Sequence, residues 1–342
     1  MSLKNLSVKT KIPKLLKSKL KNKRIDQIYK KFEKSLNINE NFAVAVSGGP
    51  DSLALAALSK IYAINHGLDA KFFIVDHKLR PESSKEAKLV KQILEQIFIT
   101  SKILKWVGKK PSKNIQAAAR VKRYELLLKE CEKFGIINIL LGHHQDDLFE
   151  NFFIRILRGS GLKGLISLDK KRKIGNKNLL RPLLDQKKKD LVFLSQNVFN
   201  FYIKDPSNND EKYQRVKIRN MIETLQKNGL DKNKFFKTLK NLRYSESVIE
   251  FYVKKNLQKN TIYFEKKNKI LLNKNFFHQP YEVVFRAFSE TIKLIGKKYY
   301  PPRGKKLDNI INGISNNRSF KATLGGCIIE KVNETVILFK EC

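Results

Sequence analysis

Between residue 25 and about residue 215, short hydrophobic runs alternate with longer stretches in which apolar residues recur at helical spacing. The short runs have the length of buried strands, and a segment with helical periodicity follows each of them. This alternation predicts an α/β fold in which a parallel sheet carries helices on both faces, as in Rossmann-like proteins. The expected strands are 42–46, 71–75, 102–107 and 136–141, and the expected helices are 53–64, 85–98, 114–134 and 145–157.

The pattern changes after residue 215. Helical periodicity then dominates, with strand signals at 261–264 and 270–272. From residue 307 a helix is expected, and the strand-like runs 326–330 and 335–339 after it have the spacing of a hairpin. We therefore predict a basic arm (1–24), an α/β catalytic domain (25–215), a mainly helical domain (216–298) and a small C-terminal α+β segment (299–342).

The chain is strongly basic. It has 70 lysine and arginine residues against 32 acidic residues, which gives a formal net charge of +38. This excess favours a polyanionic partner, because basic side chains that neutralise phosphates release counterions. An A/T-rich coding sequence would give the same abundance of lysine, asparagine and isoleucine, and the two explanations are compatible. Residues 1–24 contain no acid, which predicts a basic arm or helix that touches RNA.

The spacing of the cysteines and the hydropathy of the chain indicate the cellular compartment in which the protein is expected. Cys131, Cys327 and Cys342 are well separated, and none belongs to a C-x-x-C pair. They predict neither a disulfide framework nor a cysteine metal site. No apolar window is long enough for a membrane span, and the N-terminus lacks the apolar core of a secretory signal. We expect a reduced, cytoplasmic protein without a membrane partner, and the sequence leaves monomer and homodimer open.

A Gly-rich segment, residues 47–52, follows the first expected strand and precedes a helix. Glycines let the backbone approach a phosphate closely, and the amides of such a loop direct their positive ends at the anion. An aspartate would repel a phosphate unless it binds Mg²⁺ or a donor, so it predicts a metal-bound pyrophosphate. An ordinary strand-to-helix turn is the alternative. The predicted phosphate-binding residues are Ser47, Gly48, Gly49, Pro50, Asp51 and Ser52, with Asp51 as the Mg²⁺ ligand.

Two further polar segments begin where an expected buried strand ends. They are 76–80 and 142–147. In an open α/β sheet, ligands bind at the carboxyl ends of the strands, so both segments should converge on residues 47–52. The second segment combines two imidazoles with two carboxylates, which can bind a metal, transfer a proton or hold an ammonium group. A solvated helix start is the alternative, and the set is His143, His144, Asp146 and Asp147.

These features resemble the PP-loop ATP pyrophosphatase superfamily and, within it, the tRNA(Ile)-lysidine synthetase family. The resemblance covers about residues 25–220 and is weaker beyond them, where YPPR (300–303) and TLGG (323–326) are similar to the family's tRNA-contacting region. The motifs that carry it are SGGPDS (47–52), VDHKLR (75–80), AARVKRY (118–124), LGHHQDDLFE (141–150), RGSGLKGL (158–165) and RPLL (181–184).

The resemblance implies an activity. Members of the family transfer AMP from ATP to O2 of cytidine 34 in the CAU anticodon of tRNA(Ile), and free L-lysine then attacks C2. The products are lysidine, AMP and pyrophosphate, and the modified tRNA reads AUA as isoleucine. The resemblance therefore implies a ligase that forms a C–N bond, uses ATP with Mg²⁺, and acts on tRNA(Ile) and L-lysine. It also implies that the segment 216–298 is a tRNA-binding domain.

Residue roles follow from the same resemblance. It implies that residues 47–52 bind the pyrophosphate part of ATP, that Arg123 contacts the adenylated phosphate, and that Asp147 with His143 handles the lysine. Asp76 and His77 are expected near the adenine ribose. The predicted catalytic residues are Asp51, Arg123, His143 and Asp147.

Arginines supply the expected substrate contacts. Arg120 and Arg123 lie three residues apart on one helix face, so both can reach one ligand. The family's Arg-Asn-x-Ile-Arg pattern is present here as RVKIR (215–219), which keeps both arginines but lacks the amide. Asn151 stands where threonine is usual, a mild departure. The predicted substrate or RNA contacts are Arg120, Arg158, Arg215 and Arg219.

Other functions fit the sequence less well. A tRNA 2-thiolating enzyme shares the ATP chemistry but needs paired cysteines, and Cys131 has the sequence context of a core residue. An amidating PP-loop ligase of small metabolites has no use for a net charge of +38. A non-catalytic RNA-binding protein would explain the charge but not residues 47–52 together with 142–147.

Overall fold

The computed structural model describes residues 13–108, 111, 115–203, 211–212, 214–297, 302 and 304–341. The chain forms two compact units, Met1–Leu230 and Asp231–Cys342. The division lies later than the expected boundary at 215–216. The reason is that helix α9 (Gln214–Lys227) packs against α6 (Gln145–Ile156) and so belongs to the first unit.

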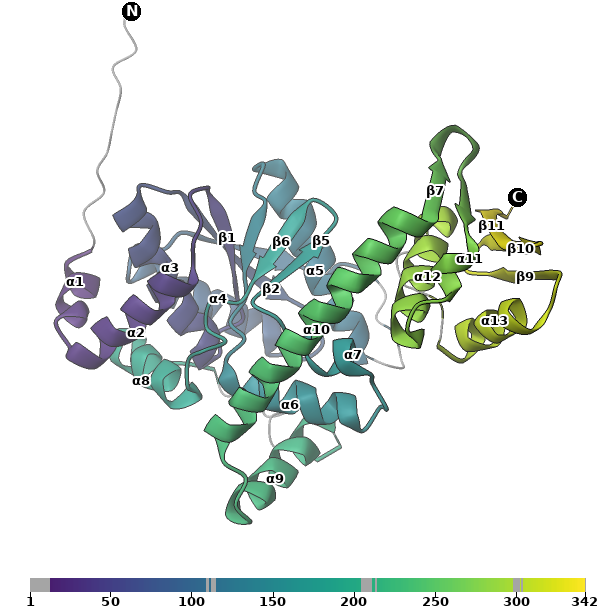
Figure 1. Ribbon diagram of the computed structural model, residues 1–342. Coiled ribbons are helices and arrows are strands. Elements are labelled where there is room, and N and C mark those ends of the chain that lie inside the picture. The colour runs from purple at the N-terminus through teal and green to yellow at the C-terminus, as the bar shows by residue number, and fades with distance from the viewer. Residues whose placement is uncertain are drawn as a thin grey trace, which may run out of the picture. The chain divides into compact units, whose positions relative to one another are not determined.

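A six-stranded sheet forms the centre of the first unit (Figure 1). Its strand order is β3-β2-β1-β4-β6-β5, and all neighbouring pairs are parallel except the β5–β6 hairpin. The predicted α/β fold with a mostly parallel sheet is therefore confirmed. The strands are β1 (Phe42–Val46), β2 (Ala70–Asp76), β3 (Ser101–Lys105), β4 (Asn138–Leu140), β5 (Lys171–Ile174) and β6 (Lys177–Leu180).

Helices cover both faces of this sheet because successive strand residues point to opposite sides. Phe42 and Val44 belong to one hydrophobic core, and Ala43 between them belongs to another. Residues of α1, α2, α3, α4 and α8 complete the first core, and residues of α5 complete the second. The helices are α1 (Lys14–Leu20), α2 (Lys23–Ser35), α3 (Pro50–His66), α4 (Ser83–Glu95), α5 (Ile115–Lys133), α6, α7 (Leu162–Leu165), α8 (Lys188–Phe199) and α9.

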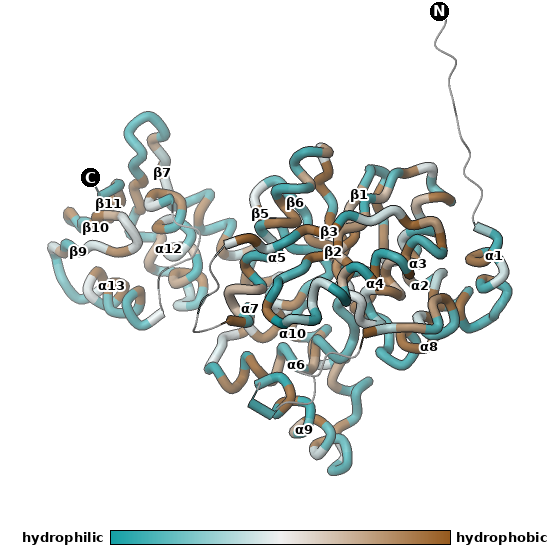
Figure 2. Tube along the Cα trace, turned by 180° about the vertical axis from the view of Figure 1, so that it is seen from behind, coloured by the Kyte–Doolittle hydropathy of each residue, from teal (hydrophilic) through white to brown (hydrophobic). Residues whose placement is uncertain are grey.

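Helix α3 is the most deeply embedded of the site-bearing elements. Residues around its whole circumference are buried, which agrees with the brown turns along α3 in Figure 2. Pro50 occupies the first helical turn, where its missing N–H costs nothing. Gly67 ends the helix with φ +65°, and its N–H returns to the carbonyl groups of the last turn. The helix is therefore a rigid base for the loop that precedes it.

Part of the expected basic arm is folded onto this unit. In residues 13–24, Leu16 is buried in the core, and the side chain of Asn22 accepts the N–H groups of Arg24 and Ile25 to begin α2. Arg24 Nη2 lies 2.7 Å from Asp190 Oδ1 on α8. Residues 1–12 lie outside the described residues.

The second unit is built on a five-stranded antiparallel sheet of order β7-β8-β11-β10-β9. The expected boundary at 298–299 falls inside this unit, because β8 pairs with β11 and one core joins both sides. The predicted hairpin is confirmed as β10–β11, whereas β9 was not predicted. The elements are α10 (Lys232–Asn260), β7 (Thr261–Phe264), η2 (Glu265–Lys267), β8 (Lys269–Leu272), α11 (Lys274–Phe277), α12 (Tyr281–Gly296), α13 (Gly304–Asn316), β9 (Phe320–Leu324), β10 (Cys327–Val332) and β11 (Thr335–Lys340).

Among the helices that the structure describes, none combines the length and the apolar character needed to cross a membrane.

Candidate active site

The site lies where the strand order of the first sheet reverses. The chain leaves β1 toward β2 on one side, and β4 lies on the other side of β1. Residues 47–52 follow β1 and residues 142–147 follow β4, so both segments start at the same edge. A Cβ on Gly142 would lie 3.3 Å from the backbone N of Ser52. The structure thus brings these two predicted segments into direct contact.

Gly48 fixes the shape of the loop after β1. Its φ is +87°, and a Cβ there would lie 2.5 Å from Cγ2 of Val90 and 2.7 Å from Cδ1 of Ile203. Its carbonyl oxygen accepts the N–H of Ile203 at 2.9 Å. Only glycine satisfies both the backbone conformation and the space.

Ser52 is used inside the same loop. Its buried hydroxyl accepts the N–H groups of Ser47 and Gly48, both at 3.1 Å, and donates to the carbonyl of Gly49 at 2.9 Å. The side chain therefore holds the loop in a tight turn, and its expected contact with phosphate stays a prediction. Gly49 begins α3 and has no side chain to cap it, so the first amides of α3 are left for an anion.

Asp51 and His144 link the two segments. Nε2 of His144 lies 3.5 Å from Oδ2 of Asp51 and 3.7 Å from Oδ2 of Asp147. The N–H of Asp146 donates to Nδ1 of His144 at 3.2 Å, so Nδ1 is an acceptor and Nε2 carries the proton that faces the carboxylates. Burial alone would lower the pKa of His144, but the hydrogen bond to Asp51 and the charges of Asp147, Asp51 and Asp146 raise it.

His143 has the opposite electrostatic setting. Burial lowers its pKa to about 3, with the positive charges of Arg181, Arg120 and Arg215 adding to the shift and Asp147 opposing it. Within the described part of the chain, its buried Nδ1 has no hydrogen-bond partner. His143 is therefore a neutral imidazole near neutral pH.

Asp147 stands at the start of α6. Its Oδ2 accepts the N–H of His144 at 2.8 Å, and the two residues form a capping box. Burial would raise the pKa of Asp147, but the charges of His144 and His143 and the bond from the His144 N–H lower it. The carboxylate is therefore ionised and held in place, as binding an ammonium group would require.

Both carboxylate oxygens of Asp76 accept hydrogen bonds from residues that follow it in the chain. Oδ1 accepts the N–H of Lys78 and the hydroxyl of Ser83, both at 2.9 Å, and Oδ2 accepts the hydroxyl of Ser84 at 2.6 Å. The side chain is 2% exposed. Its expected contact with the ribose stays a prediction that would require some of these bonds to be shared. His77 follows it and packs edge-on against Trp106, with 6.2 Å between ring centroids.

Glu150 is a site residue for which the sequence predicted no role. It is buried in α6, and its Oε1 accepts Nε of Arg219 at 2.6 Å. Nε of Arg215 lies 3.9 Å from Oε2. Of the predicted RNA contacts, Arg219 is thus paired with a carboxylate, and Arg215 keeps about half of its side chain exposed. A glutamate directly after the apolar pair Leu148-Phe149 was the available signal.

The remaining predicted arginines lie around the same edge. Electrostatic interactions connect Arg123 with Arg120 and Arg215. Arg120 lies over the ring of Tyr124, 5.4 Å from its centroid. Arg158 donates from Nη2 to Oε1 of Gln214 at 3.2 Å. Arg120 is partly buried, and Arg123 and Arg158 are exposed. Guanidinium groups suit phosphate recognition.

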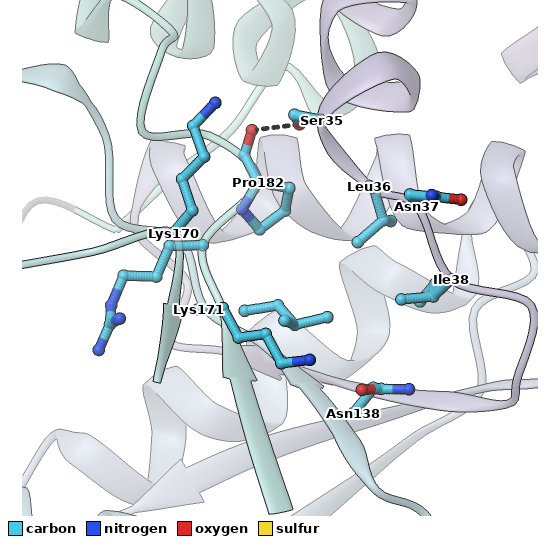
Figure 3. Close-up of a pocket in the computed structure, with 10 residues that line it drawn as sticks. Ser35, Leu36, Asn37, Ile38, Asn138, Lys170, Lys171 and Pro182 are labelled. Carbon is cyan, nitrogen blue, oxygen red and sulfur yellow. Dashed lines mark hydrogen bonds between the residues drawn. The ribbon is translucent and has the colours of Figure 1, made fainter. Parts of the chain in front are cut away.

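A cavity of about 200 Å³ lies elsewhere in this unit, between the end of α2 and strands β4 to β6. Figure 3 shows Ser35 donating to the carbonyl of Pro182, with Asn37, Asn138 and Lys171 around the opening. Of its lining residues, none was predicted as a site residue. The cavity therefore does not mark the site built on residues 47–52.

The site could hold a metal through a single carboxylate. Among the described residues, no three His, Cys, Asp or Glu side chains are grouped to hold a metal ion. Oδ1 of Asp51 is buried and has no hydrogen-bond partner in that same part of the chain. An unpartnered carboxylate oxygen beside a phosphate loop fits Mg²⁺, which typically takes one or two carboxylates and completes its shell with substrate phosphates.

Comparisons with known proteins agree with this geometry. Residues 17–225 match the model of the PP-loop domain family. A tRNA(Ile)-lysidine synthase from Orientia tsutsugamushi is 34% identical, and the match covers 89% of this chain and 70% of the relative. One from Wolbachia pipientis wMel is 31% identical, with 89% and 71% covered. A U34-tRNA thiolase structure from Methanococcus maripaludis, 18% identical, has a TM-score of 0.56 over 64% of this chain and 78% of that chain, and shows likeness of fold alone.

Proposed function

Because the chain belongs to the tRNA(Ile)-lysidine synthase family of PP-loop proteins, we propose that it ligates L-lysine to cytidine 34 of tRNA(Ile) at the expense of ATP. The observation that carries the proposal is the meeting of a phosphate loop, 47–52, with the ionised Asp147 and neutral His143 of the neighbouring segment. One segment is suited to hold a nucleotide and the other to hold an amine.

Activation is the first half of the reaction. O2 of the cytidine attacks the α-phosphate of ATP, the bond between the α- and β-phosphates breaks, and pyrophosphate leaves. The first amides of α3 bind the pyrophosphate portion. Asp51 would hold Mg²⁺, which neutralises charge on the phosphates when bound. Arg123, with Arg120 beside it, binds the phosphate that joins the RNA.

Ligation is the second half. The lysine amine attacks C2 of the cytidine, the C2–O2 bond breaks, and AMP leaves with that oxygen. The amine must lose protons as the C–N bond forms, and Asp147 is the carboxylate that holds the ammonium group and accepts one. His143, a neutral imidazole near Asp147, is assigned to the same amine. Asp76 and His77 stay assigned to the ribose side of ATP.

The two cysteines that the structure describes support this chemistry over sulfur transfer, and Cys342 lies outside the described residues. Burial raises the pKa of Cys131 to about 12 and that of Cys327 to about 11. Sulfur transfer requires a thiolate nucleophile, and both thiols are protonated and inaccessible near neutral pH.

The rest of the chain is proposed to bind the tRNA. Arg158, Arg215 and Arg219 border the catalytic segment, and the residues from 231 onward, which carry many exposed lysines, contact more distant parts of the tRNA. The free thiols and the tRNA substrate favour action in the cytoplasm.

Lysine incorporation tests the proposal. A tRNA(Ile) transcript with a CAU anticodon is incubated with the full chain, ATP and radiolabelled lysine, and RNA-bound label and AMP are measured. Both should appear together, and a transcript with uridine at position 34 should accept no label. AMP release without label would reject lysidine formation and leave adenylation standing. Full ATP cleavage by Asp51→Ala would reject the assignment of the phosphate site.

A further inference from the structure

Arg181 is a buried arginine that forms no ion pair with a carboxylate of the described residues. It is 2% exposed, its Nη1 donates to the carbonyl of Asp169 at 2.6 Å, and it hydrogen-bonds to Tyr124. Across the described residues its Nε has no hydrogen-bond partner, and its neighbours Arg120 and Arg172 are also positive. Burying a cation without a carboxylate is costly unless a bound anion compensates the charge.

Further arginines extend this positive region. Arg155 interacts electrostatically with Arg158, Arg172 and Arg120, and its pKa is lowered by burial and then by these three charges. The members come from α5, α6, the segment after α6, β5 and the segment after β6, so the fold brings them together from well-separated parts of the sequence. We call the set the arginine track: Arg120, Arg155, Arg158, Arg172 and Arg181.

The arginine track leads from the site to the surface. Arg181 is buried, Arg120 and Arg155 are partly buried, and Arg158 and Arg172 are exposed. At its inner end, Arg181 and Arg120 act on His143, which adjoins the phosphate loop. Positive charge that continues from interior to surface suits an extended polyanion. A triphosphate is compact, and residues 47–52 already provide for its pyrophosphate part.

We propose that the arginine track binds consecutive phosphodiester groups of the RNA strand next to the nucleotide that is modified. Planar guanidinium groups bind phosphate oxygens in pairs, and the anion would supply the counter-charge that Arg181 lacks. The identity of the RNA rests on the proposed function. The track itself rests on the burial, the unpartnered Nε and the grouping of like charges.

A pair of double variants of the full chain tests the track. Arg155→Ala/Arg172→Ala removes two members of the track. The control, Lys171→Ala/Lys173→Ala, removes the two exposed charges that flank Arg172 on β5. Binding of the tRNA(Ile) anticodon stem–loop is measured by fluorescence anisotropy over a series of KCl concentrations. The arginine variant should bind about tenfold more weakly, and its salt slope should fall by about 1.4, since each neutralised phosphate of a single strand contributes about 0.7.

Neutral linkages in the RNA backbone identify the phosphodiester groups that the arginine track binds. A set of stem–loops, each with one neutral methylphosphonate linkage in the loop, is bound to the wild-type chain and to the arginine variant. At least one linkage should weaken binding to the wild type but not to the variant, because the interaction is already lost there. Thermal unfolding midpoints of both double variants establish that each is folded at the assay temperature.

The outcomes separate the two proposals. If the arginine variant binds RNA like the lysine variant, or if every linkage weakens both proteins equally, the track is not a phosphodiester site. A tenfold rise in KM for ATP with unchanged RNA binding would assign the arginines to ATP and also overturn the inference. The anisotropy assay needs no lysine, so failure of lysine incorporation by the wild type would reject the proposed function without touching this result.

Discussion

Nε of Arg219 lies 2.6 Å from Oε1 of Glu150, and this ion pair joins α9 to α6, the helix that begins in the candidate site. The side chain of Glu150 is 5% exposed and that of Arg219 is 31% exposed. The pair therefore lies in a partly dry environment, where loss of one partner leaves an uncompensated charge.

Glu150→Gln should lower the free energy of unfolding by about 2 kcal/mol, less than for a fully buried pair because Arg219 is partly solvated. It should also reduce lysine incorporation, since Arg215 and Arg219 lose their anchor. Glu125→Gln is the control. Its partner Lys122 lies 3.0 Å away on the surface of α5, and its loss should cost less than about 0.5 kcal/mol. Equal unfolding free energies for both variants would contradict the role of Glu150.

Gly48→Ala should destabilise the first unit by about 2 kcal/mol, because the added methyl group meets Val90 and Ile203 in a conformation that alanine rarely adopts. It should also raise KM for ATP in a pyrophosphate-release assay. Gly49→Ala is the neighbouring control: there a Cβ would have only Oγ of Ser47 nearby, at 3.9 Å. Urea unfolding compares the two, and an equally stable G48A would refute the packing argument.

Asp76→Asn separates two roles for Asp76. If the carboxylate supports the loop after β2, losing the bond from Ser84 should lower stability by about 1.5 kcal/mol and leave KM for ATP within about twofold. Asp69→Asn, which removes an exposed partner of Lys71, should change stability little. A tenfold rise in KM for ATP with unchanged thermal stability would instead favour the ribose contact.

His143 gives the first unit a predictable pH dependence. Its folded-state pKa is about 3, below the ordinary 6.5. As the pH falls through 6.5 the unfolded chain takes up a proton and the folded chain does not, so the stability is present above 6.5 and is lost toward 3. Between pH 6.5 and 5 the loss should be about 2 kcal/mol.

The titration of Asp147 and His144 does not produce a stability loss of this kind between pH 6.5 and 5. Asp147 has a lowered pKa and loses its contribution only below its ordinary value, at more acid pH. His144 has a raised pKa, so its contribution is complete below pH 6.5 and is lost above it. His143→Gln should remove the slope in urea titrations between pH 5 and 6.5, and His66→Gln, at the end of α3, should retain it. A slope that persists in H143Q would contradict the assignment.

The sequence predicted those parts of the fold in which local pattern and tertiary packing agree. The apolar run of β1 and the glycines after it determine the loop, and the strand at 42–46 is confirmed residue for residue. Strand β6 departs from such a pattern. It begins with Lys177, which is buried and donates a hydrogen bond to the carbonyl of Ile136 at 2.8 Å. Its partner β5 is almost entirely exposed and basic, and the apolar residues of β6 are only Leu179 and Leu180, so neither strand has an apolar run like that of β1.

The missed site residues share another cause. The role of Glu150 depends on Arg219, and that of Arg181 on Tyr124 and the carbonyl of Asp169. These partners are distant in the sequence or lie on another element, and no local spacing signals them. Motifs identify the residues that touch a ligand, whereas the residues that hold them become visible only when burial and pairing are known.

Strand β11 occupies the centre of the second unit's sheet, although it follows the other four strands of that sheet in chain order. The hairpins β7–β8 and β9–β10 are each formed by neighbouring segments, and residues 335–340 join them within the sheet by pairing with both β8 and β10. The sheet of this unit is therefore continuous only when β11 is in place. A variant that cannot form β11 would expose two open sheet edges, one on β8 and one on β10, which invite pairing with other chains.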